Sequence, residues 1–479
     1  MSGVATGFAR VTVVTPDRRI DVALPEDLPL ADLYPDVLRL ARATQPDGVP
    51  TGFHLVRRDG TVLDGGLSLA AQQVRDGDLL ALRPFAESLP PAVYDDVADA
   101  IAGAVSADHR FWSPELTRAF GLTGATVLLA LLGLALWSAG PHHDAHGLPG
   151  VLAGVTAVVL TALAGVRARV YGDAPAAVAL GLGALPHALI AGTGLLAAAR
   201  PGEGPGRLQF LAGCVAVLVT AVLLAGLLPE RDAVFVAAAL AAAAGALAAF
   251  AAVLLPGTPA YRIAAVTGVA AVAAIGFLPG LAARGARLPV GYAAPGQTRG
   301  EADGEHRAET VPYERIARQA RRGHEVLVGL VGGCAAVVAG ACALLGFTDA
   351  VFPELLALAL GLAVMLRARL FRYTAQVLAL TSAGLLGLAL LIAGLSLHAR
   401  QFAQDAAPAD ADLRTLWLTA AVALGAAALT AVALVVPRLG VSPFWGRVLD
   451  LVDGLALLSL VPLALAVLDV YRLVRGATG

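Results

Sequence analysis

Apolar segments long enough to cross a membrane follow one another along most of this chain, between about residues 119 and 471. A helix needs about 20 residues to cross the ~30 Å hydrocarbon core of a bilayer. Because that core holds no water, each segment must satisfy its own backbone amides, as a helix does. Eleven such segments are predicted, at residues 119–140, 147–166, 174–198, 208–228, 232–255, 261–281, 325–346, 350–366, 375–398, 413–436 and 447–470. The sequence therefore predicts an α-helical polytopic membrane protein with a transmembrane domain over residues 119–472.

Lysine is absent from the sequence, so all 34 Lys or Arg positions are arginine. This composition excludes a P-loop lysine, a Schiff-base lysine and the strand lysine of a kinase. The three cysteines lie inside predicted spans, which argues against a disulfide framework. The sequence also has no nucleophile motif and no glycine-rich phosphate loop after a strand. The residues themselves therefore offer no candidate catalytic residue and no cofactor site, and a membrane-embedded enzyme is the least supported class of function.

The N-terminal residues 1–86 are predicted to form a small soluble α+β domain. Apolar residues alternate in residues 8–15 and 19–24, as in two paired strands, and then recur at helical spacing from Leu30 to Leu40. Further short strands are predicted at 53–55, 61–63 and 78–83. This ββαββ order is typical of a ubiquitin-like β-grasp. Conjugation needs a free diglycine end, which the chain lacks because it continues beyond Pro84, so the domain is a docking module or a cap.

A connector at residues 87–118 joins this domain to the first span. Val93, Val97, Ile101 and Val105 repeat at four-residue spacing opposite several aspartates, which predicts an amphipathic helix.

Arginine placement predicts the orientation of the chain in the membrane. Sixteen arginines lie in or beside connections on the side of the N-terminal domain, and seven on the other side. Because positive residues stay on the cytosolic side, we expect a cytosolic N-terminus and an extracytoplasmic C-terminus.

The longest connection, residues 284–324, is predicted to face the cytosol. It ends in a basic helix, which is either an anchor on anionic lipid or a partner-binding arm. Its candidate binding residues are Arg315, Arg318, Arg321 and Arg322.

A short sequence recurs on this side of the membrane. Residues 166–171 (VRARVY) follow the second span, and residues 366–371 (LRARLF) follow the eighth, 200 residues later. The spacing is that of a parallel repeat of spans 1–5 on spans 7–11. The alternative is coincidence in a chain rich in arginine and alanine. The candidate partner residues here are Arg167, Arg169, Arg367, Arg369 and the nearby Arg372.

Ionisable residues are rare inside the predicted spans, where each costs several kcal/mol. His187, after Pro186 in the third span, is either a functional residue or a hydrogen-bonded packing histidine. Asp450 and Asp453 share a face of the last span and are expected either to form salt bridges or to act on protons or a partner. Histidines of the first outward loop are a poor metal signal, so no metal site is expected.

The fifth span is mostly alanine, from Val236 to Leu254. Small side chains offer a smooth surface to neighbouring helices, so we expect this helix inside the bundle.

Taken together, the chain resembles the EccD family, the polytopic membrane subunits of type VII (ESX) secretion systems of actinobacteria. The resemblance rests on residues 69–78 (LAAQQVRDGD), residues 90–99 (PPAVYDDVAD), eleven spans and a long loop after the sixth. It implies a non-catalytic subunit of the bacterial inner membrane that forms a homodimer. It also implies contact of the ubiquitin-like domain with EccC, an FtsK/SpoIIIE-type ATPase, with EccB and EccE completing the complex. Membrane lipids are expected partners and nucleic acid is not. The alternative is a secondary transporter with a regulatory domain.

Overall fold

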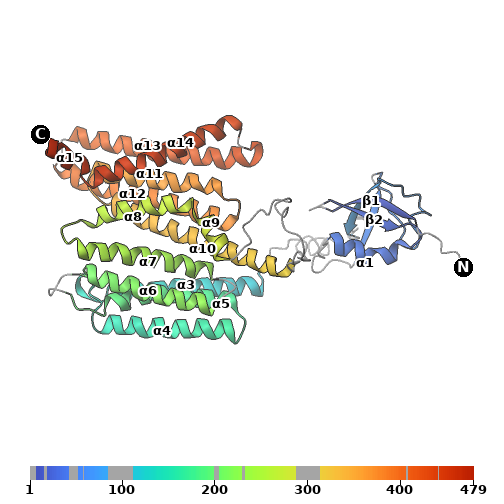
Figure 1. The fold of residues 1–479 in the computed structure, drawn as a ribbon, viewed down its shortest axis with the longest axis horizontal. Coiled ribbons are helices and arrows are strands. Elements are labelled where there is room, and N and C mark those ends of the chain that lie inside the picture. Colours follow the sequence, from blue (N-terminus) through green and yellow to red (C-terminus); the bar gives the residue numbers. More distant parts are fainter. Residues whose placement is uncertain are drawn as a thin grey trace, which may run out of the picture. The chain divides into compact units, whose positions relative to one another are not determined.

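The structure is a computed structural model that describes residues 7–15, 19–41, 52–57, 59–84, 112–198, 204–228, 232–286, 313–405, 408–440 and 442–478 (Figure 1). The chain divides into two compact units, Met1–Trp112 and Ser113–Gly479. Most of the predicted connector lies outside the described residues, as does the loop over residues 287–312.

In its described residues, the first unit is a four-stranded sheet with one helix. Its elements are β1 (Phe8–Val14), β2 (Arg19–Pro25), α1 (Leu30–Ala41), β3 (Phe53–Arg57) and β4 (Leu79–Pro84), and the strand order is β2-β1-β4-β3. β1 runs antiparallel to β2 and parallel to β4, and β3 runs antiparallel to β4. The alternating residues Val11 and Val13 face the core together with Leu30, Leu33 and Val37 of α1. This arrangement confirms the predicted β-grasp order.

The turns of this domain follow the predicted chemistry. Gly60 and Gly77 both have φ +89°, which favours glycine. The Thr61 N–H donates to the Asp59 carboxylate at 2.9 Å, and this bond lowers the pKa of Asp59. The predicted strand at 61–63 is wrong, since only a single bridge joins Val56 to Val62. The reason is a turn at Asp64, whose carboxylate accepts from the Gly66 N–H at 2.9 Å and diverts the chain.

A core substitution tests whether this domain folds as one unit. Leu80 is fully buried on the central strand β4, whereas Leu40 on α1 is half exposed. We expect Leu80→Ala to lower the free energy of unfolding of residues 1–86 by about 2–5 kcal/mol, since it leaves a cavity. Leu40→Ala is the control and should change it by less than about 1 kcal/mol. Chemical denaturation followed by circular dichroism measures both, and equal effects would contradict the described core.

The second unit is a set of helices. They are α3 (Pro114–Trp137), η2 (Pro141–His143), α4 (Leu148–Arg169), α5 (Ala174–Thr193), α6 (Arg207–Leu227), α7 (Ala233–Leu254), α8 (Ala260–Ile275), α9 (Leu278–Gly285), α10 (Tyr313–Gly346), α11 (Val351–Arg367), η3 (Ala368–Leu370), α12 (Thr374–Asp405), α13 (Pro408–Leu439), α14 (Pro443–Val467) and α15 (Val470–Thr478). Among the described residues ten helices are long and apolar enough to cross a membrane, or eleven if the bent pair α8 and α9 forms one span.

The sixth predicted span, 261–281, is not one straight helix. α8 ends before Gly276, and α9 leaves at 65° to it. Pro279 stands in the first turn of α9, where it has no N–H to continue the ladder of α8. Hydropathy detects the apolar length here and misses the break.

The helices form two bundles, each with its own core. In the first bundle α5 packs on α3, α4 and α6. In the second, α10 and α11 pack on one another and on α8 and α12, and α14 packs on α11. α7 lies between α6 and α10 and joins the bundles (Figure 1). α13 packs on α12 and buries none of its residues over 415–436.

The alanine-rich helix α7 lies between α6 and α10, as its small side chains predict, but it is not fully enclosed. α7 is placed between the bundles, but only Phe235, Ala242 and Ala249 are buried on it. Methyl side chains are too short to close the space beside α8, so one face of α7 stays open.

Candidate functional site

Arginines gather at one end of the membrane unit, which we call the arginine-rich end, and six of them pair with a neighbouring element. They are Arg118 at the start of α3, Arg167 and Arg169 at the end of α4, Arg322 on α10, Arg367 at the end of α11, and Arg369 in η3. Each of these six either donates a hydrogen bond to a neighbouring element or lies within 4.0 Å of a carboxylate there. The other predicted candidates at this end, Arg318, Arg321 and Arg372, are exposed, and the side chain of Arg315 lies outside the described residues.

In the first bundle, Asp173 forms ion pairs with two of these arginines. Its carboxylate accepts from the Ala176 N–H at 3.2 Å, so it caps the start of α5. It also bonds to the Arg118 guanidinium, and Arg167 Nη1 lies 4.0 Å from its Oδ2. Asp173 therefore links α3, α4 and α5.

Arg169 bonds to no carboxylate among the described residues. Its Nε donates to the Leu227 carbonyl at 2.9 Å, and its Nη2 donates to the Gly226 carbonyl at 2.7 Å. These carbonyls end α6 and have no partner inside that helix. Arg169 thus caps α6 from α4.

In the second bundle, the matching arginines reach carboxylates instead. Arg369 Nη2 donates to Asp450 Oδ1 at 2.7 Å, and Arg367 Nε lies 4.0 Å from Asp453 Oδ1. Both aspartates are on α14, one turn apart, as the sequence predicted. The pairs join η3 and α11 to α14, which identifies the salt-bridge role as the one the structure supports for these two aspartates.

A buried ion pair joins the two bundles. Arg322 Nη1 lies 2.5 Å from Asp232 Oδ2, before the first residue of α7. The Asp232 side chain is fully buried, whereas that of Arg322 is 45% exposed. Glu325 Oε2 lies 3.8 Å from the same nitrogen, Arg322 Nη1. Burying a carboxylate is costly unless a partner compensates its charge, so this contact depends on Arg322.

Above this pair, α10 touches α7 through glycine. A Cβ built on Gly329 would lie 2.6 Å from the Val236 Cβ and 2.7 Å from the Ala233 carbonyl. One built on Gly333 would lie 2.7 Å from the Leu240 Cβ. Only glycine permits this backbone approach, which resembles the small-residue contacts of membrane helices. We call the contact of Arg322, Gly329 and Gly333 with α7 the seam.

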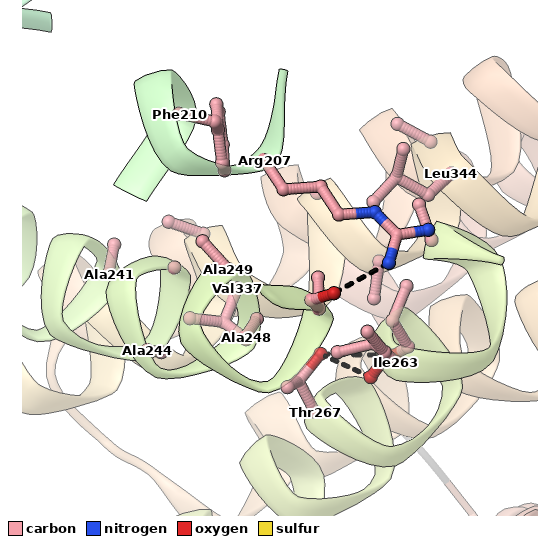
Figure 2. Close-up of a pocket in the computed structure, with 18 of the residues that line it drawn as sticks. Arg207, Phe210, Ala241, Ala244, Ala248, Ala249, Ile263, Thr267, Val337 and Leu344 are labelled. Carbon is pink, nitrogen blue, oxygen red and sulfur yellow. Dashed lines mark hydrogen bonds between the residues drawn. The ribbon is translucent and has the colours of Figure 1, made fainter. Parts of the chain in front are cut away.

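Farther along, the bundles separate and leave an apolar groove of about 650 Å³ between α6, α7, α8 and α10 (Figure 2). Its walls are mostly alanine, and the Thr267 hydroxyl that faces it donates to carbonyls of its own helix. Arg207 stands at the rim and donates to the carbonyls of Ala252 at 2.5 Å and of Leu255 and Thr258 at 3.0 Å. The guanidinium therefore caps α7, and the groove offers hydrocarbon rather than polar groups.

His187 is fully buried on α5. Its Nδ1 lies 2.8 Å from the Gly183 carbonyl, and its ring faces Gly133 of α3. It lines none of the grooves described here. Within the described residues no three His, Cys, Asp or Glu side chains gather as a metal site. The outward-loop histidines instead bond to backbone, His143 to Trp137 and His146 to Gly194.

Sequence reasoning missed the seam and the Arg207 cap. Glycine recurs three and four residues apart on α10, at residues 329, 332 and 333, but the chain has 53 glycines and such pairs are common by chance. The partner of Asp232 is 90 residues away along the chain, and no local pattern marks it.

Two families match the two units of the chain. Residues 117–477 match the EccD-like transmembrane domain, and residues 8–82 match the WXG100 protein secretion system (Wss) protein YukD. The ESX-4 secretion system protein eccD4 of Mycobacterium tuberculosis H37Rv is 28% identical over 485 residues, or 98% of this chain and 97% of the relative. The ESX-3 secretion system protein EccD3 of the same strain is 32% identical over 275 residues, or 53% and 55% of the two chains.

Two solved structures have a similar fold. Protomer 1 of the ESX-3 core complex aligns with a TM-score of 0.56 at 22% identity, covering 97% of this chain and all of that one. A chain of the MycP5-free ESX-5 inner membrane complex in State II aligns with a TM-score of 0.51 at 20% identity, covering 88% and 99%.

A ubiquitin-like domain joined to ten or eleven apolar helices defines a class of polytopic membrane protein. Within that class, the chain belongs to the EccD family, as the sequence resemblance predicted.

Loss of Arg322 tests the ion pair of the seam. Arg322→Gln leaves the buried Asp232 carboxylate without its counter-charge, so we expect a loss of about 2–3 kcal/mol, below the cost for a fully buried pair because water reaches this guanidinium. Thermal unfolding in detergent, followed by tryptophan fluorescence, should show a lower midpoint. The neighbouring exposed Arg321→Gln is the control and should leave the midpoint in place. Adding Asp232→Asn to Arg322→Gln should recover part of the loss.

A single methyl group tests the glycine contact. Gly329→Ala inserts a Cβ where α7 already lies, and overpacking of this kind costs about 1–3 kcal/mol. Gly340→Ala on the same helix meets nothing within 4 Å and should be neutral or gain up to about 1 kcal/mol from helix propensity. The two variants are compared by thermal unfolding in one detergent. Equal midpoints would show that α7 and α10 are not in this close contact.

Proposed function

We propose that this chain is a non-catalytic structural subunit of a type VII secretion complex in the bacterial inner membrane. In this proposal it forms a homodimer through its membrane unit and docks an EccC-type ATPase through its ubiquitin-like domain, alongside EccB-type and EccE-type subunits. The observation that carries the proposal is the match of both units of one chain, in order, to secretion-system families. The transporter alternative has less support, because His187 packs against α3 and both Asp450 and Asp453 face arginines.

The ubiquitin-like domain has apolar side chains to offer a partner. Its core is complete, yet five large apolar residues remain between 43% and 57% exposed: Phe8, Leu28, Leu40, Val62 and Leu67. Buried aromatic and aliphatic anchors supply most of the energy of protein interfaces. These side chains support a docking role for the domain.

The membrane unit has free surface for a second copy. α13 buries no residue over 415–436, and α3 buries only Gly133. The gathering of arginines at one end supports a cytosolic placement of that end, and with it a cytosolic N-terminus and an extracytoplasmic C-terminus.

A deletion tests the docking proposal. Tagged full-length protein and protein lacking residues 1–86 are purified from the native host in mild detergent. We expect the full-length chain to recover an FtsK/SpoIIIE-type ATPase and a second, differently tagged copy of itself. The deleted form should lose the ATPase and keep the second copy, since the membrane unit has its own core.

Point variants sharpen this test. Replacing exposed Phe8 or Leu40 by Asp should weaken recovery of the ATPase without unfolding the domain. Recovery of the full-length chain alone, under conditions that preserve other membrane complexes, would overturn the proposal.

A further inference from the structure

A second apolar groove, of about 650 Å³, lies between α4 and α6 and runs to the arginine-rich end. Ala162 and Gly165 make it deep on the α4 side, and Leu223 lines it on α6. The only hydroxyls on its walls, those of Thr161 and Thr220, donate to carbonyls of their own helices at 2.7 and 2.9 Å. Both hydroxyl hydrogens are thus already used within the protein, and the mainly apolar walls suit a hydrocarbon chain.

The mouth of this groove carries positive charge. Arg169 lines it, and its guanidinium is held in place by the two carbonyls that end α6. Those bonds use Nε and Nη2, which leaves Nη1 for another acceptor. Arg167, two residues earlier, lies over the Tyr171 ring with its guanidinium carbon 5.1 Å from the ring centroid. Arg118 and Arg167 both pair with the Asp173 carboxylate, and Arg169 pairs with no carboxylate among the described residues. The three guanidinium groups therefore face one described carboxylate between them, which leaves a net positive charge at the mouth.

Residues 366–371 of the second bundle resemble residues 166–171 in sequence and allow a comparison within the same chain. There Arg369 and Arg367 face Asp450 and Asp453 of α14. Arg169, at the end of α4, instead donates to backbone carbonyls at the end of α6. Among the described residues, Arg169 thus lacks the carboxylate that Arg369 has, while Arg167 shares the Asp173 carboxylate with Arg118.

We propose that the α4–α6 groove binds an anionic phospholipid, with an acyl chain along α4 and α6 and the phosphate on Arg169 and Arg167. Phosphate accepts from arginine in a bidentate manner, and charge-assisted bonds of this kind are among the stronger ones. Basic pockets between membrane helices commonly select such head groups. The site goes beyond the secretion role, because it needs only this chain and a membrane.

Lipid retention measures the site directly. Full-length protein in detergent is mixed with phosphatidylglycerol or phosphatidylcholine, and bound lipid is counted by native mass spectrometry over a lipid titration. We expect the wild type to retain one phosphatidylglycerol per chain with at least ~10-fold higher affinity than phosphatidylcholine. Glycerol 3-phosphate, which has the phosphate without the acyl chain, should neither bind nor compete, which distinguishes a lipid from a free phosphate.

Four variants decide the outcome. Arg169→Gln should lose the preference for phosphatidylglycerol, and Arg169→Lys should keep part of it. Ala162→Trp, which fills the groove from an exposed position, should lose retention of both lipids. Arg369→Gln removes the matching arginine that a carboxylate already neutralises, and should bind like the wild type.

Equal retention of the two lipids by the wild type would overturn the proposal. So would loss of the preference in Arg369→Gln to the same extent as in Arg169→Gln. If Arg169→Gln fails to fold because the end of α6 loses its cap, Ala162→Trp and Arg169→Lys still give the answer.

Discussion

The close approach of α7 and α10 is the contact on which the membrane unit depends, because it joins two bundles that have separate cores. Apolar area contributes little to it, since lipid tails are as apolar as the side chains they would replace. The stability of the α7–α10 contact therefore comes from complementary shape and from charge. Gly329 and Gly333 let the two backbones meet, and Arg322 compensates the buried Asp232 where the helices converge. Where alanine replaces larger residues on the same helix, the bundles separate into a groove.

Arginine has a second role at both ends of the bundles, which is to cap the ends of neighbouring helices. In a bilayer the last carbonyls of a helix need a donor, and a long arginine side chain can reach them from a neighbouring helix. Arg169 caps α6 and Arg207 caps α7, each from a neighbouring helix. One guanidinium thus satisfies two or three carbonyls and fixes a helix end to its neighbour. A chain with no lysine is well suited to this role, because an ammonium group lacks the planar fork.

Much of the fold is predictable from local pattern. Alternation predicts β1 and β2, the spacing of Leu30, Leu33 and Val37 predicts α1, and hydropathy predicts the spans because the bilayer demands a length. The 65° break after α8 is not predicted, because hydropathy averaged over a span contains no information on where Pro279 interrupts the backbone hydrogen bonds of the helix. The partners of the arginines are not predicted either. Arg169 and Arg369 stand in nearly the same local sequence, yet one meets carbonyls and the other a carboxylate, because the choice depends on which helix packs alongside.

The sparse packing of α13 bears on how readily the chain can change its neighbours. Along residues 415–436 nothing is buried, so in a single copy the side of this helix that faces away from α12 is open to lipid. Exchanging lipid for a protein surface there gains almost nothing from hydrophobicity, and only complementary shape or a hydrogen bond distinguishes one neighbour from another. Adding or removing a single methyl group on α13 therefore changes the affinity for a partner, and a partner bound there can dissociate again.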